Sequence, residues 1–174
     1  MDEQKIKYTH ETVIRMLEQD LKEKEIPTMR QNATDDTPET LNYVVGGVGL
    51  DGDEVLGEAM FLPNTPEDFF YTFISSMLLS DEIDEAYLDE VIVAISILNF
   101  YVPMGSFLYS ATDKMLVYRN SAMISFDLPM KQIYKQAALL VEKTYEQVDK
   151  YVEILLKISE GQSNTDELIG LFGY

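Results

Sequence analysis

Residues 41–62, LNYVVGGVGLDGDEVLGEAMFL, contain two apolar runs on either side of a charged turn. The runs, Leu41–Leu50 and Glu54–Leu62, have the length and composition of strands. The Asp51-Gly52 pair between them is a strong signal for a hairpin. Glycines inside the runs indicate bulges or other irregular strand positions. The segment therefore predicts two antiparallel strands, and this hairpin decides the fold class.

Two further stretches extend the predicted sheet. Thr28–Ala33 precedes the hairpin as a third strand, and a turn at residues 35–38 joins the two. Ser106–Ser110 and Met115–Ile124 form a second hairpin, because their aromatic and β-branched residues favour strands. We therefore expect a mostly antiparallel sheet of about five strands.

Helical periodicity marks both ends of the chain. Thr9–Glu25 places its apolar residues on one face, and Thr9 is the expected N-cap. The longest helix begins at Pro129 and carries an apolar stripe to about Ser159. Gly161 is the expected end of this helix.

A third helix is expected in the middle of the chain, after residues 65–68. The sequence Thr-Pro-Glu-Asp supplies a cap, a proline for the first helical position and two acids for the first turn. Four of the following apolar residues share one helical face: Phe70, Phe73, Ile74 and Met77.

A fourth helix, from Leu88 to the stop at Pro103, is apolar on two sides. Val91, Ile95 and Leu98 lie roughly opposite a second apolar set: Val93, Ile97 and Phe100. A helix that is apolar all round is buried on both sides. One side can face the sheet, and the other needs a second helix or a second subunit.

With the two middle helices counted as one helical pair, these elements follow the order α-β-β-β-α-β-β-α, which is typical of an α+β fold with an antiparallel sheet and flanking helices. We expect residues 1–160 to form a single domain. Residues 161–174 form a C-terminal tail, with a possible short helix that has a capping signal at Thr165.

The charge balance limits the partners that this chain can have. There are 13 basic and 31 acidic residues, so the net charge is −18. Such a surface repels nucleic acid and anionic lipid, and we expect neither as a partner. The acidity fits plain solubility, and it also fits a partner with a basic segment. No apolar run approaches the ~20 residues of a spanning helix, and we expect a cytoplasmic protein.

The sequence offers no catalytic, metal or cofactor site that residue types and spacing can define. It has no cysteine, and its one histidine, His10, is expected at the edge of the first helix rather than as a ligand. Six acids within residues 81–90 are expected to form a solvated helix start. Carboxylate pairs are abundant, so an enzyme with a carboxylate-based site stays open as an alternative.

Two polar residues lie among apolar neighbours and are expected to have structural roles. Asn99 projects from the apolar side of its helix, and we expect it to bind backbone groups near the following hairpin. Arg119 lies in an aromatic-rich strand, where it either pairs with a carboxylate across the sheet or marks a partner site.

The segment 97–119 contains Ile97-Leu98-Asn99, then Gly105-Ser106-Phe107, then Val117-Tyr118-Arg119, and a long helix follows. These short motifs and the element order resemble the YbjN family and the related type III secretion chaperone-like domains. The resemblance implies a small, acidic, cytoplasmic homodimer that wraps an extended segment of a client protein and has no catalytic residues. The chain departs from the simplest family pattern at residues 81–90 and in the tail after 161.

We therefore expect a non-enzymatic protein-binding module, a chaperone-like homodimer that engages a partner polypeptide. Val93, Ile97 and Phe100 are the candidate dimer or partner face. The alternatives are a regulatory or structural protein, whose tail residues 168–172 dock onto another chain, and the carboxylate enzyme.

Overall fold

The computed structural model describes residues 3–34, 37–49, 52–65 and 67–173, and these form an α+β fold around one antiparallel sheet. The predicted α+β class is confirmed, but the sheet has one strand more than the five or so that were expected. The sheet has six strands in the spatial order β1-β2-β3-β4-β6-β5. The elements, in chain order, are α1 (Glu3–Glu23), β1 (Thr28–Gln31), β2 (Thr40–Val48), β3 (Asp53–Phe61), β4 (Phe70–Ser80), α2 (Leu88–Tyr101), β5 (Ser106–Ser110), β6 (Met115–Ser125), α3 (Met130–Ser159) and α4 (Thr165–Gly170).

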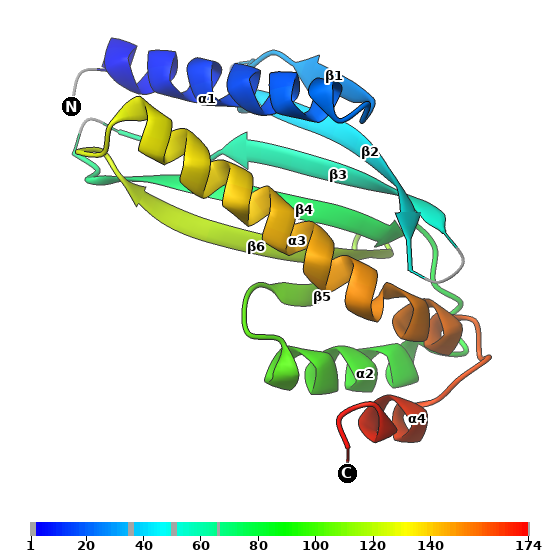
Figure 1. The fold of residues 1–174 in the computed structure, drawn as a ribbon. Coiled ribbons are helices and arrows are strands. Elements are labelled where there is room, and N and C mark those ends of the chain that lie inside the picture. The colour runs from blue at the N-terminus through cyan, green and yellow to red at the C-terminus, as the bar shows by residue number, and fades with distance from the viewer. Residues whose placement is uncertain (1–2, 35–36, 50–51, 66, 174) are drawn as a thin grey trace.

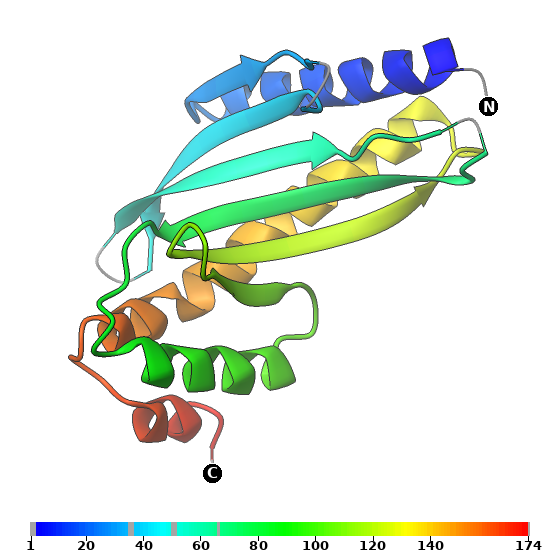
Figure 2. The same cartoon turned by 180° about the vertical axis from the view of Figure 1, so that it is seen from behind.

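Helices α1 and α3 cover one face of the sheet (Figure 1). Their apolar stripes supply Val13 and Leu17 from α1, and Ala137 and Val148 from α3, all of them buried. Seen from behind, strands β2, β3, β4 and β6 lie in front of these helices with no helix over them (Figure 2). The hydrophobic core therefore lies between the sheet and α1 and α3, and the opposite face of the sheet is open.

The predicted helix after residue 65 was wrong, because Phe70–Ser80 is strand β4. Every second residue from Tyr71 to Leu79 is buried beneath the helices, which is the period of a strand. Two of the four residues between them, Ile74 and Leu78, are also apolar, so the run also has apolar residues at helical spacing. The acids before the strand cap a turn instead: a carboxylate oxygen of Asp68 accepts a hydrogen bond from the Thr65 backbone N–H at 2.6 Å. Pro66 lies outside the described residues.

The bounds of two other predicted elements differ from the structure. Helix α1 begins at Glu3, so Thr9 is a buried residue inside the helix, and its hydroxyl donates to the Lys5 carbonyl at 2.8 Å. Strand β1 ends at Gln31, two residues earlier than expected. The β2–β3 hairpin is confirmed, with an irregular register between Val45 and Val48, and residues 50–51 of its turn are not described.

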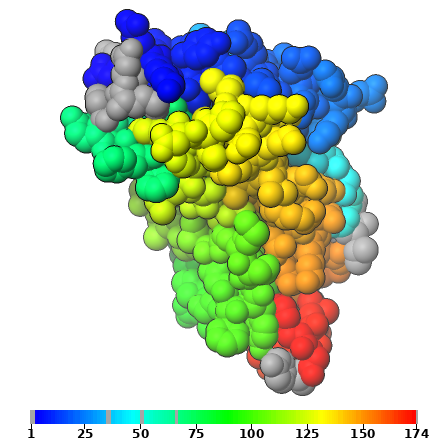
Figure 3. Space-filling view, turned by 60° about the vertical axis from the view of Figure 1, so that its left-hand side comes forward, coloured from blue at the N-terminus to red at the C-terminus, as the bar shows by residue number. Residues whose placement is uncertain are grey.

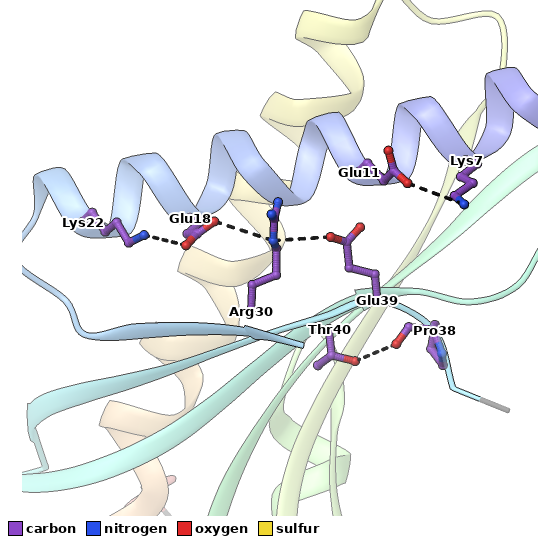
Figure 4. Close-up of polar contacts among 8 residues, drawn as sticks. All are labelled: Lys7, Glu11, Glu18, Lys22, Arg30, Pro38, Glu39 and Thr40. Carbon is purple, nitrogen blue, oxygen red and sulfur yellow. Dashed lines mark hydrogen bonds and ion pairs between the residues drawn. The ribbon is translucent and has the colours of Figure 1, made fainter. Parts of the chain in front are cut away.

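Strand β1 is a short edge strand that polar contacts attach to α1. Arg30 of β1 lies between two carboxylates, with its Nε 3.5 Å from Glu39 and 4.0 Å from Glu18 of α1 (Figure 4). Lys22 also pairs with Glu18, at 2.5 Å. Partly exposed pairs of this kind contribute only ~0–1 kcal/mol each, so we assign them to positioning this edge rather than to overall stability.

Gly57 of β3 is required by a tyrosine on the neighbouring strand. Tyr43 is its direct partner in β2, and the ring is buried with its hydroxyl 3.4 Å from Ser75 Oγ. A Cβ at residue 57 would lie 2.2 Å from the nearest ring carbon. Glycine here therefore lets the aromatic ring pack flat across the strand pair.

We predict that Gly57→Ala lowers the free energy of unfolding by about 2 kcal/mol, because the Tyr43 ring has to move out of its packed position. Urea denaturation measures this change. Gly46→Ala is the matched control, since a Cβ there meets only the Glu54 Cγ at 3.9 Å. Equal effects of the two substitutions would contradict the assigned role of Gly57.

Candidate protein-binding surfaces

Helix α2 is apolar on two sides, and the described part of the chain buries one of them. Val91, Ala94 and Leu98 are fully buried against α3 and β5. On the other side Val93 is 50% exposed and Phe100 is 82% exposed. A phenylalanine with that much of its surface in water loses much of the hydrophobic stabilisation that burial gives. This outer side of α2 is the first candidate surface.

The short helix α4 lies beside α2 and completes an apolar groove. In Figure 3 the C-terminal segment, in red, lies against the green segment that includes α2. The groove has a volume of about 500 Å³. It is lined by Ile92, Val93, Ser96, Ile97, Phe100, Tyr101 and Ile169. The Ser96 hydroxyl already donates to the Ile92 carbonyl at 2.9 Å, so the groove offers mainly apolar contact. The structure thus brings Val93, Ile97 and Phe100 together on one wall.

Residues of the tail attach α4 to α2. A carboxylate oxygen of Glu90 accepts hydrogen bonds from the backbone N–H and the hydroxyl of Thr165, at 3.0 and 3.2 Å. Leu168 is fully buried, and the Phe172 ring stacks on Tyr101 with 4.0 Å between centroids. The N-cap is Asn164 rather than Thr165, because its side chain accepts from the Glu167 backbone N–H. Much of the tail's apolar patch therefore packs within this chain.

The segment 97–119 forms a structural clamp between α2 and β5. The Asn99 amide donates to the Phe107 carbonyl at 2.9 Å, and the Asn99 side-chain oxygen accepts from the Phe107 N–H at 2.8 Å. The expected role of Asn99 is confirmed. Gly105 has a φ of +68°, and a Cβ there would lie 2.4 Å from the Tyr118 hydroxyl. Asn99 and Gly105 of the motif therefore hold the start of β5, whereas Ile97 of the same motif lines the groove.

The open face of the sheet is a second candidate surface, which sequence reasoning missed. We define the open sheet face by the outward residues of the central strands: Leu56, Glu58 and Met60 of β3, Ile74, Ser76 and Leu78 of β4, and Val117, Arg119 and Ser121 of β6, with Asn42, Val44, Leu62, Thr72, Ser106, Leu108 and Met123 around them. Slightly more than half of them are apolar, and among these Met123 is 74% exposed and Leu56 is 44% exposed. The signal was the second apolar face of residues 70–80, which the helical interpretation assigned to a helix.

Arg119 lies in the middle of the open sheet face. Arg119 and Glu58 flank Ser76 of β4 in one row across three strands. Burial raises the pKa of the Glu58 carboxyl, and the nearby Arg119 charge and Ser76 hydroxyl partly offset that rise. The arrangement fits an interaction across the sheet, and it leaves open a role for Arg119 in contacting a partner.

A cavity beside α1 contains His10. The cavity has a volume of about 690 Å³. It lies between α1, the loop that joins β1 to β2, and the loop that follows β3. His10 stacks on Phe61 with 4.5 Å between ring centroids, and burial lowers the pKa of His10 to about 4. His10 is therefore a partly buried residue, and it lies inside α1 rather than in the first turn because the helix begins at Glu3. Burial also raises the pKa of Glu39 in the cavity wall, and Arg30 opposes that shift.

Other acidic residues have partners within the chain. In residues 81–90, Glu85 pairs with Lys114 at 3.1 Å, Asp84 accepts from the Ala86 N–H, and Glu90 holds the start of α4. Within the part of the chain that the structure describes, no group of three or more His, Asp or Glu side chains is placed to hold a metal ion. Across the same described residues, no helix is long and apolar enough to cross a membrane.

Comparison of the chain with protein-family models, with curated proteins and with solved structures finds no match in any of the three.

We predict that Asn99→Ala lowers the free energy of unfolding by about 2 kcal/mol, because the Phe107 N–H and carbonyl lose their side-chain partners in a partly buried position. Chemical denaturation measures this loss. Ser96→Ala on the exposed side of the same helix is the control and is expected to change stability by less than ~0.5 kcal/mol. A neutral result at Asn99 would show that the clamp does not hold β5.

His10 is the one histidine, so its NMR titration is unambiguous. We expect a midpoint near pH 4, well below the ~6.5 of an exposed imidazole. The folded state then binds fewer protons than the unfolded state between these values. The contribution of neutral His10 to stability is thus complete above pH ~6.5 and falls as the pH drops toward 4, by about 3 kcal/mol. His10→Gln removes this contribution, and a midpoint between 6 and 7 would contradict the burial.

Proposed function

We propose that this chain is a non-enzymatic protein-binding module that acts as a homodimer and engages a segment of a partner polypeptide. The observation that carries the proposal is the outer side of α2. A helix that buries one apolar side in its own chain and leaves Val93 and Phe100 largely exposed has the composition of a binding surface. The resemblance of residues 97–119 to chaperone-like domains leads to the same kind of function.

The α2 groove suits an apolar segment rather than a polar small molecule. Its wall presents mainly aliphatic and aromatic side chains, and the Ser96 hydroxyl already has a partner. Amphipathic helices bind in grooves of this chemistry through apolar residues spaced along one face. The partner segment that fits is therefore apolar on the side that enters the groove. Basic residues at its margins would meet a protein whose net charge is −18.

The carboxylate enzyme is a weaker alternative. The cavity beside α1 contains acids and one imidazole, and the observation that favours it is the raised pKa of Glu39. Glu39, however, lies 3.5 Å from the Arg30 guanidinium, which gives this carboxylate a structural partner. His10 stacks on Phe61 in the same wall, which accounts for its neutral state through packing.

We predict that Phe100→Glu abolishes recovery of the partner polypeptide while the fold stays intact, because the side chain contributes exposed surface rather than core packing. The measurement is affinity purification from the native cell, read by mass spectrometry against the unchanged chain. The free energy of unfolding is expected to change by less than ~0.5 kcal/mol.

Tyr8→Glu is the matched control, since it also places an acid at an exposed aromatic, on α1 at the other end of the molecule (Figure 1). It is expected to leave recovery unchanged. If Phe100→Glu and the unchanged chain recover the same polypeptides, the groove is not the partner site.

A further inference from the structure

The open sheet face differs in charge from the rest of the protein. The whole chain carries −18, but the three rows that cross β3, β4 and β6 contain one acid and one base. These two residues, Glu58 and Arg119, lie in the same row, one strand to either side of Ser76. The centre of this face is therefore neutral, with a polar middle row between two rows that are mostly apolar. Another copy of the acidic chain can approach here without the repulsion that acts elsewhere.

We propose that a second copy of this chain covers the open sheet face, through a two-fold axis that runs parallel to β4 beneath Ser76. The inference rests on the homodimer of the proposed function and gives it an interface. Such a rotation places each row of one copy opposite the same row of the second copy. It also places β3 of one copy opposite β6 of the other. Glu58 then faces Arg119 of the second copy, and Arg119 faces the second copy's Glu58.

The apolar rows are self-complementary under the same rotation. Leu56 of β3 and Val117 of β6 lie one strand to either side of Leu78, so each faces the other in the second copy. Leu78 of one copy faces Leu78 of the second copy. An isologous interface requires this property, because the same surface must fit itself after a half-turn. Because the axis is parallel to β4, the two sheets pack in the aligned arrangement of β-sandwiches, ~10 Å apart.

The size of the face suits a stable dimer. Five strands at ~4.8 Å and four rows at ~6.8 Å give roughly 650 Å² per copy, near the ~800 Å² per partner of a standard interface. Met123, at 74% exposure, is among the residues that would be covered. The two reciprocal ion pairs near the centre fix the register between the copies, because a shifted sheet would leave a charge unpaired in an apolar contact.

This interface differs from the one that sequence alone suggested. Val93, Ile97 and Phe100 on α2 were expected to form the dimer or partner face. The open sheet face supplies a broader and self-complementary surface, so the α2 groove is left free for the partner polypeptide. Each copy in the dimer then presents one groove.

Charge exchange tests the two-fold pairing. Sedimentation velocity of the unchanged chain is expected to show a dimer. Arg119→Glu and Glu58→Arg each place like charges opposite one another twice, and each is expected to raise the dimer dissociation constant at least ~100-fold. An equimolar mixture of the two variants is expected to form a heterodimer within about tenfold of the original affinity, because every charge pair is then opposite in sign.

Arg15→Glu on α1 is the matched control and is expected to leave the dimer unchanged. Met123→Lys provides an independent test at a position too exposed to affect folding, and is expected to weaken the dimer about tenfold. A monomeric unchanged chain, or single variants that dimerise as well as the unchanged chain, would overturn the inference. So would a mixture that stays monomeric while each variant is folded by circular dichroism.

The outcomes separate this inference from the proposed function. A dimer that dissociates with Phe100→Glu and is insensitive to charge exchange would place the interface on α2, which overturns the inference but leaves a dimeric binding module. Charge-exchange results as expected, together with partner recovery that does not depend on Phe100, would support the interface and contradict the proposed groove.

Discussion

The structure depends on a central strand that is apolar on both faces. Strand β4 pairs with β3 on one side and β6 on the other, so neither of its edges is free. Phe73 and Met77 point into the core beneath the helices, whereas Ile74 and Leu78 point to the opposite side. Burial of the inner set stabilises the fold by roughly 1.5–3 kcal/mol per large side chain. The outer set gains no such cover from any described helix of this chain.

The helices are distributed in a way that leaves two apolar surfaces. Helices α1 and α3 both lie on the inner face, and α2 is held at the far end by the bonds of Asn99 to Phe107. The tail adds α4 beside α2 through the Glu90 carboxylate and the buried Leu168. The helices of this chain therefore cover the inner face of the sheet and one side of α2. The described helices leave the open sheet face and the outer side of α2 uncovered.

Local sequence signals predicted the elements whose two faces differ in polarity or whose turns are distinctive. Both hairpins and the end of α3 at Gly161, where φ is +70°, follow from such signals. The partner of Asn99 also followed from the need to satisfy a half-buried amide near a hairpin. Residues 70–80 did not, because an apolar run with two similar faces fits both the helical and the strand period. The Thr-Pro-Glu-Asp start then favoured the wrong one, since the same residues also make a capped turn.

The same ambiguity decided how much of the two candidate surfaces could be predicted from the sequence. The outer side of α2 was predictable, because its composition is visible within fourteen residues. The open sheet face was not, since it joins β3, β4 and β6, whose residues are brought together only by the register of the sheet. The row of Glu58, Ser76 and Arg119 illustrates the point, because its two charged members lie far apart in the sequence.

The central claim is that a second copy covers the open sheet face. Hydroxyl-radical footprinting across a range of protein concentrations tests it directly, because methionine side chains in water oxidise readily. The account predicts that oxidation of Met123 falls as the concentration rises and the dimer forms. Oxidation of Met104, which is exposed between α2 and β5, stays constant. Oxidation of Met123 that is independent of concentration, in a protein shown to be dimeric, would contradict the claim.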